Sequence, residues 1–259
     1  VAIRCGQALT KITGQSPAKG ISIELAGKTG KESKDFDYVV CALPFTKLRE
    51  VDGLDALVKA GQLSPEKLHT IQKLGYGNIT KLMLGMNGRP WENCNRFPCP
   101  SNGSFRSDNP YLQNTWITSV GQHGDDSILT VLIAGNEAKQ PEKTIRENCK
   151  NAFAHMLGMR VDEVFNHRAI MKRWPNEVTV KASYSAMRPG QYTTMREIAG
   201  TPECNGRLGF VGEHTDPELY GYMSGAVSSA LREAERIGKL EQFRSDAKYG
   251  PIHAAAASR

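Results

Sequence analysis

Apolar and polar residues alternate along the first part of the chain in the way that predicts β-strands. Residues 8–12 and 20–25 read as two strands of a hairpin, and the polar, glycine-flanked stretch 27–30 predicts a turn after them. Residues 38–44 differ, because they form a continuous apolar run that ends at a proline. Such a run is typical of a parallel strand with both faces buried.

Apolar residues at helical spacing predict three helices. The first begins at Ser64, a good N-cap residue followed by proline, and ends near Gly75. The second begins at Pro141 and ends at Gly158, and the third carries an apolar stripe over 227–237. Further strands are expected, in chain order, at 80–86, 111–119, 127–134, 169–173 and 207–212.

The composition is that of an ordinary globular protein. With 259 residues, 39% hydrophobic and 23% charged, the chain is neither collagen-like, coiled-coil nor wholly disordered, and it is long enough to bury a core. No apolar run approaches the roughly 18–20 residues of a membrane span. The 33 Lys and Arg against 27 Asp and Glu give a net charge of +6, but these charges are spread out. We therefore expect no membrane span and no nucleic-acid partner, whose binding face would cluster basic residues with aromatics.

The six cysteines do not form a metal-binding pattern. Cys94 and Cys99 are close in sequence, but no second pair of Cys or His completes the four ligands of a zinc site, so we expect no metal. A disulfide between these two remains open. Cys41 and Cys149 fall in apolar patterns and read as core residues. The scattered cysteines favour a reducing compartment, and a cytoplasmic location is the expectation.

The stretch from Gly206 to Val227 carries the strongest chemical signal. It reads as a short strand, a loop and a glycine-rich helix start, in which Gly221 and Gly225 let another group approach the backbone. The free N–H groups and the dipole of a helix start favour an anion or a carbonyl oxygen. A tightly packed helix start without any ligand explains the glycines equally well.

The full string closely resembles the C-terminal flavin-binding motif of the flavin-containing amine oxidase family, which includes monoamine, polyamine and L-amino-acid oxidases. That pattern reads approximately G-R-[ILV]-x-F-A-G-E-x-T, a variable loop, then G-[YW]-x-x-G-A-x-x-S-G. The chain matches nearly throughout, with Val211 for Ala and Ala230 for the last Gly. Other segments resemble the family in the same order, so the resemblance covers roughly residues 6–240; they are 8–12, 37–44, 76–91 and 174–191.

The resemblance implies three catalytic residues. Lys81 falls at the position of a lysine beside flavin N5, where an ammonium offsets developing negative charge. Tyr184 and Tyr222 fall where monoamine oxidases place two tyrosines that form an aromatic cage over the flavin. A surface lysine on a strand, and core or rim tyrosines, are the simpler alternatives.

The resemblance also implies a non-covalent FAD. Some monoamine oxidases attach the flavin through a cysteine that is Ser183 here. Glu213 looks like the acid at the ribityl–pyrophosphate end, and Trp174 like a tryptophan packed near the ring, whereas His214 is a loop neighbour with no catalytic role. The expected cofactor-binding residues are Leu9, Pro44, Trp174, Gly212, Glu213, Tyr222, Met223 and Ala226.

One part of the family's flavin-binding domain is missing from the sequence. A dinucleotide fold needs a strand–GxGxxG–helix unit, and no GxGxxG occurs in this chain. In the family that unit precedes the equivalent of residue 1, and the chain begins without an initiator Met. The chain therefore looks like the C-terminal half of an oxidase, and we expect an N-terminal chain or segment that carries GxGxxG.

The implied fold is α/β: the C-terminal part of an FAD-binding Rossmann-like domain, interleaved with a mixed-sheet substrate domain. Residues 1–75 and 196–244 are expected in the FAD-binding domain and residues 76–195 in the substrate domain, with a flexible tail over 245–259.

The implied reaction is oxidation of an amine C–N bond to an imine, with oxygen reduced to hydrogen peroxide. The first hypothesis is an enzyme that is complete once an N-terminal chain is added, the isolated chain being inactive. The second is a non-catalytic fragment without cofactor. The third is another flavoenzyme, such as a desaturase or a porphyrinogen oxidase, against which Lys81 and the tyrosine pair argue. The substrate is a small amine or an amino acid, and the Gly221-Tyr222 pair resembles monoamine oxidases more than the Gly-Trp of amino-acid oxidases.

Overall fold

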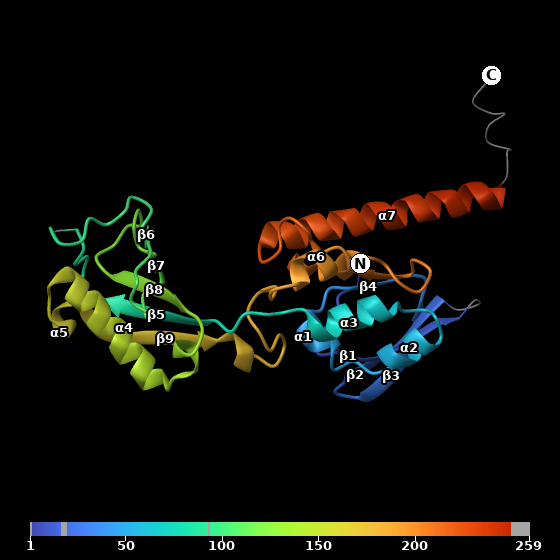
Figure 1. The fold of residues 1–259 in the computed structure, drawn as a ribbon, viewed down its shortest axis with the longest axis horizontal. Helices are drawn as coiled ribbons and strands as arrows, with labels where there is room; N and C mark the ends of the chain where they lie inside the picture. The colour runs from blue at the N-terminus through green and yellow to red at the C-terminus, as the bar shows by residue number, and fades with distance from the viewer. Residues whose placement is uncertain (1, 17–19, 93, 250–259) are drawn as a thin grey trace, which may run out of the picture. The chain divides into compact units, whose positions relative to one another are not determined.

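The computed structural model describes residues 2–16, 20–92 and 94–249, which divide into two compact units (Figure 1). Unit 1 comprises Val1–Tyr76 and Tyr184–Arg259, and unit 2 comprises Gly77–Ser183. Residues 184–195, which we expected in the substrate domain, lie in unit 1. There Ser185 forms a β-bridge with Tyr76, and the Ala186 N–H donates to the Gly75 carbonyl at 2.9 Å.

Unit 1 begins with a three-stranded antiparallel sheet. Strands β1 (Ala8–Ser16), β2 (Gly20–Gly27) and β3 (Gly30–Phe36) follow one another in the sheet order. The first two agree with the expected hairpin. The third was not expected, because its sequence, GKESKDF, has no apolar alternation; it is an edge strand with mostly exposed side chains.

A second, two-stranded sheet in unit 1 is parallel. Strand β4 (Val39–Cys41) pairs with β10 (Leu208–Phe210), so that residues far apart in sequence lie side by side. The parallel pairing agrees with the apolar run at 38–44, but the expected burial on both faces was wrong. Val40 is 43% exposed, so one face of β4 is open, whereas Cys41 on the other face is 5% exposed.

Short helices complete the core of unit 1. Helix α3 (Pro65–Lys73) begins as expected, because the Lys67 N–H donates to the Ser64 hydroxyl at 3.2 Å. The other helical segments are α1 (Phe45–Leu48), α2 (Leu54–Lys59), α6 (Gln191–Met195), η3 (Ile198–Gly200) and η4 (Glu213–Thr215). They pack with the sheets around buried residues such as Ile12, Phe45, Ile71, Leu208 and Phe210.

The long helix α7 (Met223–Tyr249), drawn in red in Figure 1, buries the face opposite to the one we expected. Val227 and Leu231 of the apolar stripe are 60% and 66% exposed, whereas Ser229 and Glu233 are 0% and 2% exposed. Hydrogen bonds explain this packing: the Ser229 hydroxyl accepts from the Gly212 N–H at 2.9 Å. The helix also continues through the first residues of the expected tail, and residues 250–259 lie outside the described part of the chain.

Unit 2 is built on a five-stranded antiparallel sheet with the order β6-β7-β8-β5-β9. The strands are β5 (Thr80–Met86), β6 (Ser104–Phe105), β7 (Asn114–Ile117), β8 (Ser127–Ile133) and β9 (Phe165–Arg173). The remaining elements are η1 (Glu137–Lys139), α4 (Glu142–Leu157), α5 (Val161–Val164) and η2 (Trp174–Asn176). Strand β7 is shorter than expected and β9 begins four residues earlier, whereas α4 ends at Gly158 as expected, with φ of 72°.

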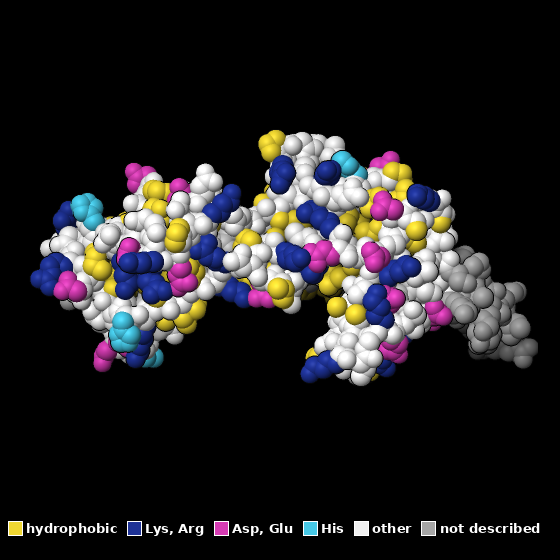
Figure 2. Space-filling view, turned by 90° about the horizontal axis from the view of Figure 1, so that it is seen from below, with side chains coloured by type: hydrophobic (Ala, Val, Ile, Leu, Met, Phe, Trp, Pro, Cys, Tyr) yellow, Lys and Arg dark blue, Asp and Glu magenta, His cyan; other side chains and the backbone are white. Residues whose placement is uncertain are grey.

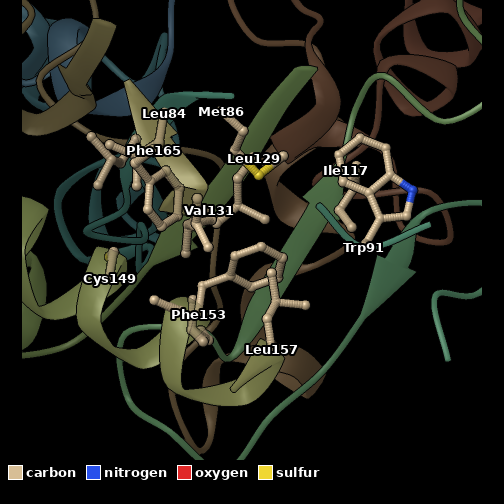
Figure 3. Packing of buried hydrophobic residues seen from close by; sticks show 14 of the residues in the cluster. Leu84, Met86, Trp91, Ile117, Leu129, Val131, Cys149, Phe153, Leu157 and Phe165 are labelled. Carbon is tan, nitrogen blue, oxygen red and sulfur yellow. The ribbon is translucent and has the colours of Figure 1, made fainter. Parts of the chain in front are cut away.

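Alternation along the central strand β5 defines two faces of this sheet. Leu82, Leu84 and Met86 are fully buried on the face that packs against α4 (Figure 3). Figure 3 shows Phe153 of this helix pointing toward Leu129 and Val131 of β8, next to Leu157. Lys81 and Met83 therefore lie on the opposite face of the sheet.

The charges on the face drawn in Figure 2 are mixed, and the cysteines of the described residues are free thiols. Figure 2 shows Lys and Arg scattered among acidic side chains on the face drawn, without a continuous basic patch. Across the described ranges, every helix is too short or too polar to cross a membrane. Cys94 and Cys99, between which a disulfide remained open, are both free, and Cys41 and Cys149 are buried as expected.

Candidate functional site

Two parallel strands bring the first candidate residues to one edge of unit 1. Because Cys41 pairs with Phe210 in parallel register, the segments that follow β4 and β10 leave the sheet at the same edge. These segments carry Pro44, Gly212 and Glu213. The rings of Phe45 and His214 lie 4.5 Å apart and nearly perpendicular, so the two segments touch. Ligands of α/β sheets bind at this edge, beyond the carboxyl ends of parallel strands.

Glu213 connects two further segments at this edge. Its Oε1 accepts the Ser185 N–H at 2.8 Å, and its Oε2 accepts the Ser185 hydroxyl at 2.6 Å. The same Oε2 also accepts the N–H of Gly221. The carboxylate therefore joins the residue after Tyr184 to the residue before Tyr222.

The two candidate tyrosines are exposed on these joined segments. Tyr184 is 47% and Tyr222 is 70% exposed. A side chain added at Gly221 would come within 3.7 Å of the Tyr184 ring, so the backbone next to one tyrosine lies beside the other tyrosine. Exposed rings that no core requires are available to contact a ligand.

The loop before α7 is held in a defined shape. The Asp216 carboxylate accepts the N–H groups of Glu218 and Leu219 at 3.0 and 2.8 Å. Gly225 must be glycine, because a Cβ there would clash with the Leu219 carbonyl oxygen. As a result the first turn of α7 is open to solvent: Met223 is 88% exposed, and Ala226 is partly exposed. The N–H groups of Gly225 and Ala226 donate to the Tyr222 carbonyl, and the N–H of the exposed Met223 and the helix dipole are available to a polar or anionic group.

His214 is sealed inside unit 1. It is 3% exposed, and burial lowers its pKa to about 3, so the ring is neutral at ordinary pH. Its ring packs against Phe45 and lies 6.2 Å from the ring of Tyr76. The Nε2 atom has no hydrogen-bond partner among the described residues. His214 is thus a packing residue between the segments that follow β4 and β10.

The remaining candidates lie elsewhere. Leu9 is in β1 of unit 1, partly buried against the core. Lys81 and Trp174 are in unit 2, where Lys81 of β5 lies directly opposite Lys172 of β9. The Lys172 ammonium lies 5.5 Å from the centre of the Trp174 ring and forms an ion pair with Glu177.

Sequence reasoning missed three polar residues next to these candidates. Ser185 and Glu177 sit in stretches without periodicity, and their importance comes from contacts with Glu213 and Lys172. The hydrogen bond from Lys172 holds the pKa of Glu177 below its usual value. Lys67 is 0% exposed, although its place in a polar first helical turn gives no sign of burial. Residue type and spacing alone carry no signal for any of the three.

Comparison with known proteins gives one family over nearly the whole chain. The model of the flavin containing amine oxidoreductase family matches residues 1–238. Lysine-specific histone demethylase 1 homolog 2 of Oryza sativa subsp. japonica is 26% identical over 240 residues, covering 89% of this chain and 29% of that protein. Probable polyamine oxidase 5 of Arabidopsis thaliana is 24% identical over 243 residues, covering 78% of this chain and 46% of that protein. The chain thus spans less than half the length of these curated relatives.

Proposed function

Because the chain belongs to the flavin containing amine oxidoreductase family, we propose that it is part of an FAD-dependent enzyme that oxidises an amine C–N bond to an imine and reduces oxygen to hydrogen peroxide. The observation that carries this proposal is the link through Glu213 between the segments of Tyr184 and Tyr222. It joins the two exposed rings to the edge where β4 and β10 end.

The residues at this edge fit a flavin nucleotide in shape and polarity. The exposed first turn of α7 presents the Met223 N–H and the positive end of the helix dipole to a carbonyl or anionic edge, whereas the N–H groups of Tyr222 and Ala226 donate to the Leu219 and Tyr222 carbonyls. Gly212, with φ of +124°, and Pro44 shape the two segments that leave the sheet at this edge, and the proposed flavin lies beside them. Ser183 has no thiol, so the proposed FAD is held without a covalent bond.

The proposed mechanism divides the work between the cofactor and the chain. The bound flavin supplies the two-electron chemistry between amine and oxygen. Tyr184 and Tyr222 orient the amine between aromatic faces, which favour amines by shape and by their quadrupole. Lys81 contributes a positive charge that stabilises negative charge developing in the reaction. Trp174 and Leu9 contribute apolar surface to the cofactor, and the imine is hydrolysed by water.

The exposed apolar face of α7 supports a further part of this proposal. The exposed fractions are 60% for Val227, 66% for Leu231 and 43% for Val40 of β4, which is high for apolar side chains. A stripe of this kind on a monomeric protein marks a surface that another element covers. We propose that a segment carrying a GxGxxG unit packs there and completes an FAD-binding domain of which unit 1 is a part, with unit 2 as the substrate domain.

A second candidate function rests on the same face. If no other segment covers it, the chain is a cofactor-free fragment without activity.

The substrate class within the first proposal is a small amine rather than an L-amino acid, since Tyr222 follows Gly221 in the manner of monoamine oxidases. One relative is named a probable polyamine oxidase, and a polyamine is also an amine.

The test is the visible absorption spectrum of the protein that contains this chain, purified with whatever remains bound after desalting. Flavin bands that bleach under anaerobic conditions with amines, and not with L-amino acids, are the expected result, with peroxide formed once air is admitted. A colourless protein that takes up no added FAD would refute the oxidase proposal for this molecule and leave the fragment. Bleaching by L-amino acids alone would overturn the substrate class.

A further inference from the structure

We propose that Glu213 is a positioning residue that sets the spacing between Tyr184 and Tyr222, a role distinct from the cofactor contact that the family resemblance implies. This inference rests on the proposed function for its catalytic meaning, but its structural part concerns unit 1 alone. The sequence motif assigns Glu213 to the ribityl–pyrophosphate end of FAD. The structure shows that three donors of the protein also bind its carboxylate.

The Glu213 carboxylate has most of its acceptor positions occupied by donors of the protein. An ionised carboxylate accepts hydrogen bonds at about four lone-pair positions and donates none. Three of these positions are taken by the Ser185 N–H, the Ser185 hydroxyl and the Gly221 N–H. Ser185 is 2% exposed, so water does not readily replace Glu213 as its partner. Hydrogen bonds to a charged acceptor are among the stronger ones in proteins.

The donors that bind Glu213 are sequence neighbours of the two tyrosines. Ser185 is covalently next to Tyr184, and Gly221 is covalently next to Tyr222. Each segment is also fixed by a backbone contact of its own. Ser185 forms a β-bridge with Tyr76, and the Tyr222 N–H donates to the Leu219 carbonyl at 3.2 Å. Glu213 is the group that ties one braced segment to the other. Together with the close approach of Gly221 to the Tyr184 ring, this carboxylate sets the spacing of the two rings.

A second glutamate of unit 1, Glu203, also accepts both the N–H and the hydroxyl of a serine, but no tyrosine is next to it or to that serine in the sequence. Glu203 accepts the Ser64 N–H at 3.0 Å and the Ser64 hydroxyl at 2.6 Å. Both glutamates are partly buried and tie a serine to a distant segment. Glu203→Gln is thus a matched control that removes a similar clamp at the start of α3.

The structural test uses ¹⁹F NMR of the full-length protein labelled with 3-fluorotyrosine. The signals are assigned with Tyr184→Phe and Tyr222→Phe. A glutamine at 213 keeps one acceptor oxygen and loses the other, so Glu213→Gln should shift or broaden both signals, and Glu203→Gln should leave both in place. Ser185→Ala, which keeps the Ser185 N–H bond, should give a smaller change in the same direction. Both signals unmoved in Glu213→Gln and Ser185→Ala, or one alone moved, would overturn the proposal.

The functional test separates the tyrosines from the cofactor. Glu213→Gln should raise the KM for the amine about tenfold, as expected for a lost charged hydrogen bond, with kcat changed less than about threefold. The dissociation constant of FAD should change less than about threefold. A large rise in that constant with an unchanged KM would mean that Glu213 serves the cofactor instead. If the parent protein oxidises no amine, the proposed function fails, while the NMR result still decides the structural part.

Discussion

The Lys67 ammonium lies 4.2 Å from the centre of the Phe210 ring, in the interior of unit 1. Its Nζ donates to the Ala199 carbonyl at 2.9 Å and to the Thr201 carbonyl at 2.7 Å. A buried lysine of α3 is thereby hydrogen-bonded to the segment that leads into β10.

This buried lysine predicts a pH dependence of stability. Burial lowers the pKa of Lys67 to about 7, against about 10.4 for an unfolded lysine. Between these values the unfolded chain binds a proton that the folded chain does not, so the free energy of unfolding should rise with pH by up to about 1.4 kcal/mol per unit. We expect melting temperatures from pH 7 to 10 to show this rise in the parent and not in Lys67→Met. The exposed Lys143→Met is the control, and an equal rise in all three proteins would contradict the expectation.

His214 predicts a further loss of stability at acid pH. Its pKa of about 3 in the folded state lies below the ordinary value of about 6.5, so the unfolded chain gains the extra proton as the pH falls from 6.5 to 3. Stability is lost over that window. His214→Phe keeps a ring against Phe45 and removes the unpartnered Nε2, so it should gain about 1 kcal/mol near pH 7 and lose less on acidification. Urea melts at pH 7 and pH 5 test this, with the exposed His155→Phe for comparison; equal acid sensitivity of His214→Phe and the parent would refute it.

The exposed stripe of α7 predicts different results for the chain alone and for the full-length protein. In the chain alone, Val227→Ser with Leu231→Ser should change stability by less than about 0.5 kcal/mol and reduce the binding of a hydrophobic dye, because these side chains are exposed. In the full-length protein the same change should lower the amount of bound FAD. Met159→Ser, an exposed position in unit 2, should do neither. Unchanged FAD content would mean that nothing packs on the stripe.

Lys81 predicts a loss of reaction rate without a loss of fold. Its side chain lies on the face of β5 that is not packed against α4, so Lys81→Met should leave the melting temperature of unit 2 nearly unchanged. If its charge stabilises the reacting groups, kcat/KM for amine oxidation should fall about 100-fold. Lys150→Met, which removes a hydrogen bond to the Asn166 carbonyl in the same unit, is the control. Equal rates in the two variants would argue against a catalytic Lys81.

Elements with clear periodicity could be predicted from the sequence, and elements fixed by polar contacts could not. The parallel strand at β4, helix α3 with its Ser64 cap, and helix α4 up to Gly158 follow local rules of pattern and capping. Strand β3 was not predicted, because an edge strand with exposed side chains needs no apolar alternation. The burial of α7 was assigned to the wrong face, because the Ser229 hydroxyl binds the distant Gly212 N–H and the Glu233 side chain packs against Gly209 of β10.

The same division holds for the candidate site. The motif placed Pro44, Gly212, Glu213 and Tyr222 near one another, and the structure brings their segments together at one edge of unit 1. The role of Ser185 could not be predicted, since it depends on the position of one carboxylate in three dimensions. Whether Lys81 of unit 2 serves the same reaction remains a prediction.

The pairing of β4 with β10 also governs the order in which the molecule can fold. All of unit 2 is synthesised between these two strands, as one continuous stretch of chain with neighbouring strands joined in an antiparallel sheet. It has its complete set of partners before Leu208 leaves the ribosome. Unit 1 must instead wait for its last segments, with Val39 and the start of α3 exposed meanwhile. Long-range pairings of this kind are slow and leave apolar surface open during synthesis. We therefore expect the first half of unit 1 to expose apolar surface for longer during synthesis than unit 2 does.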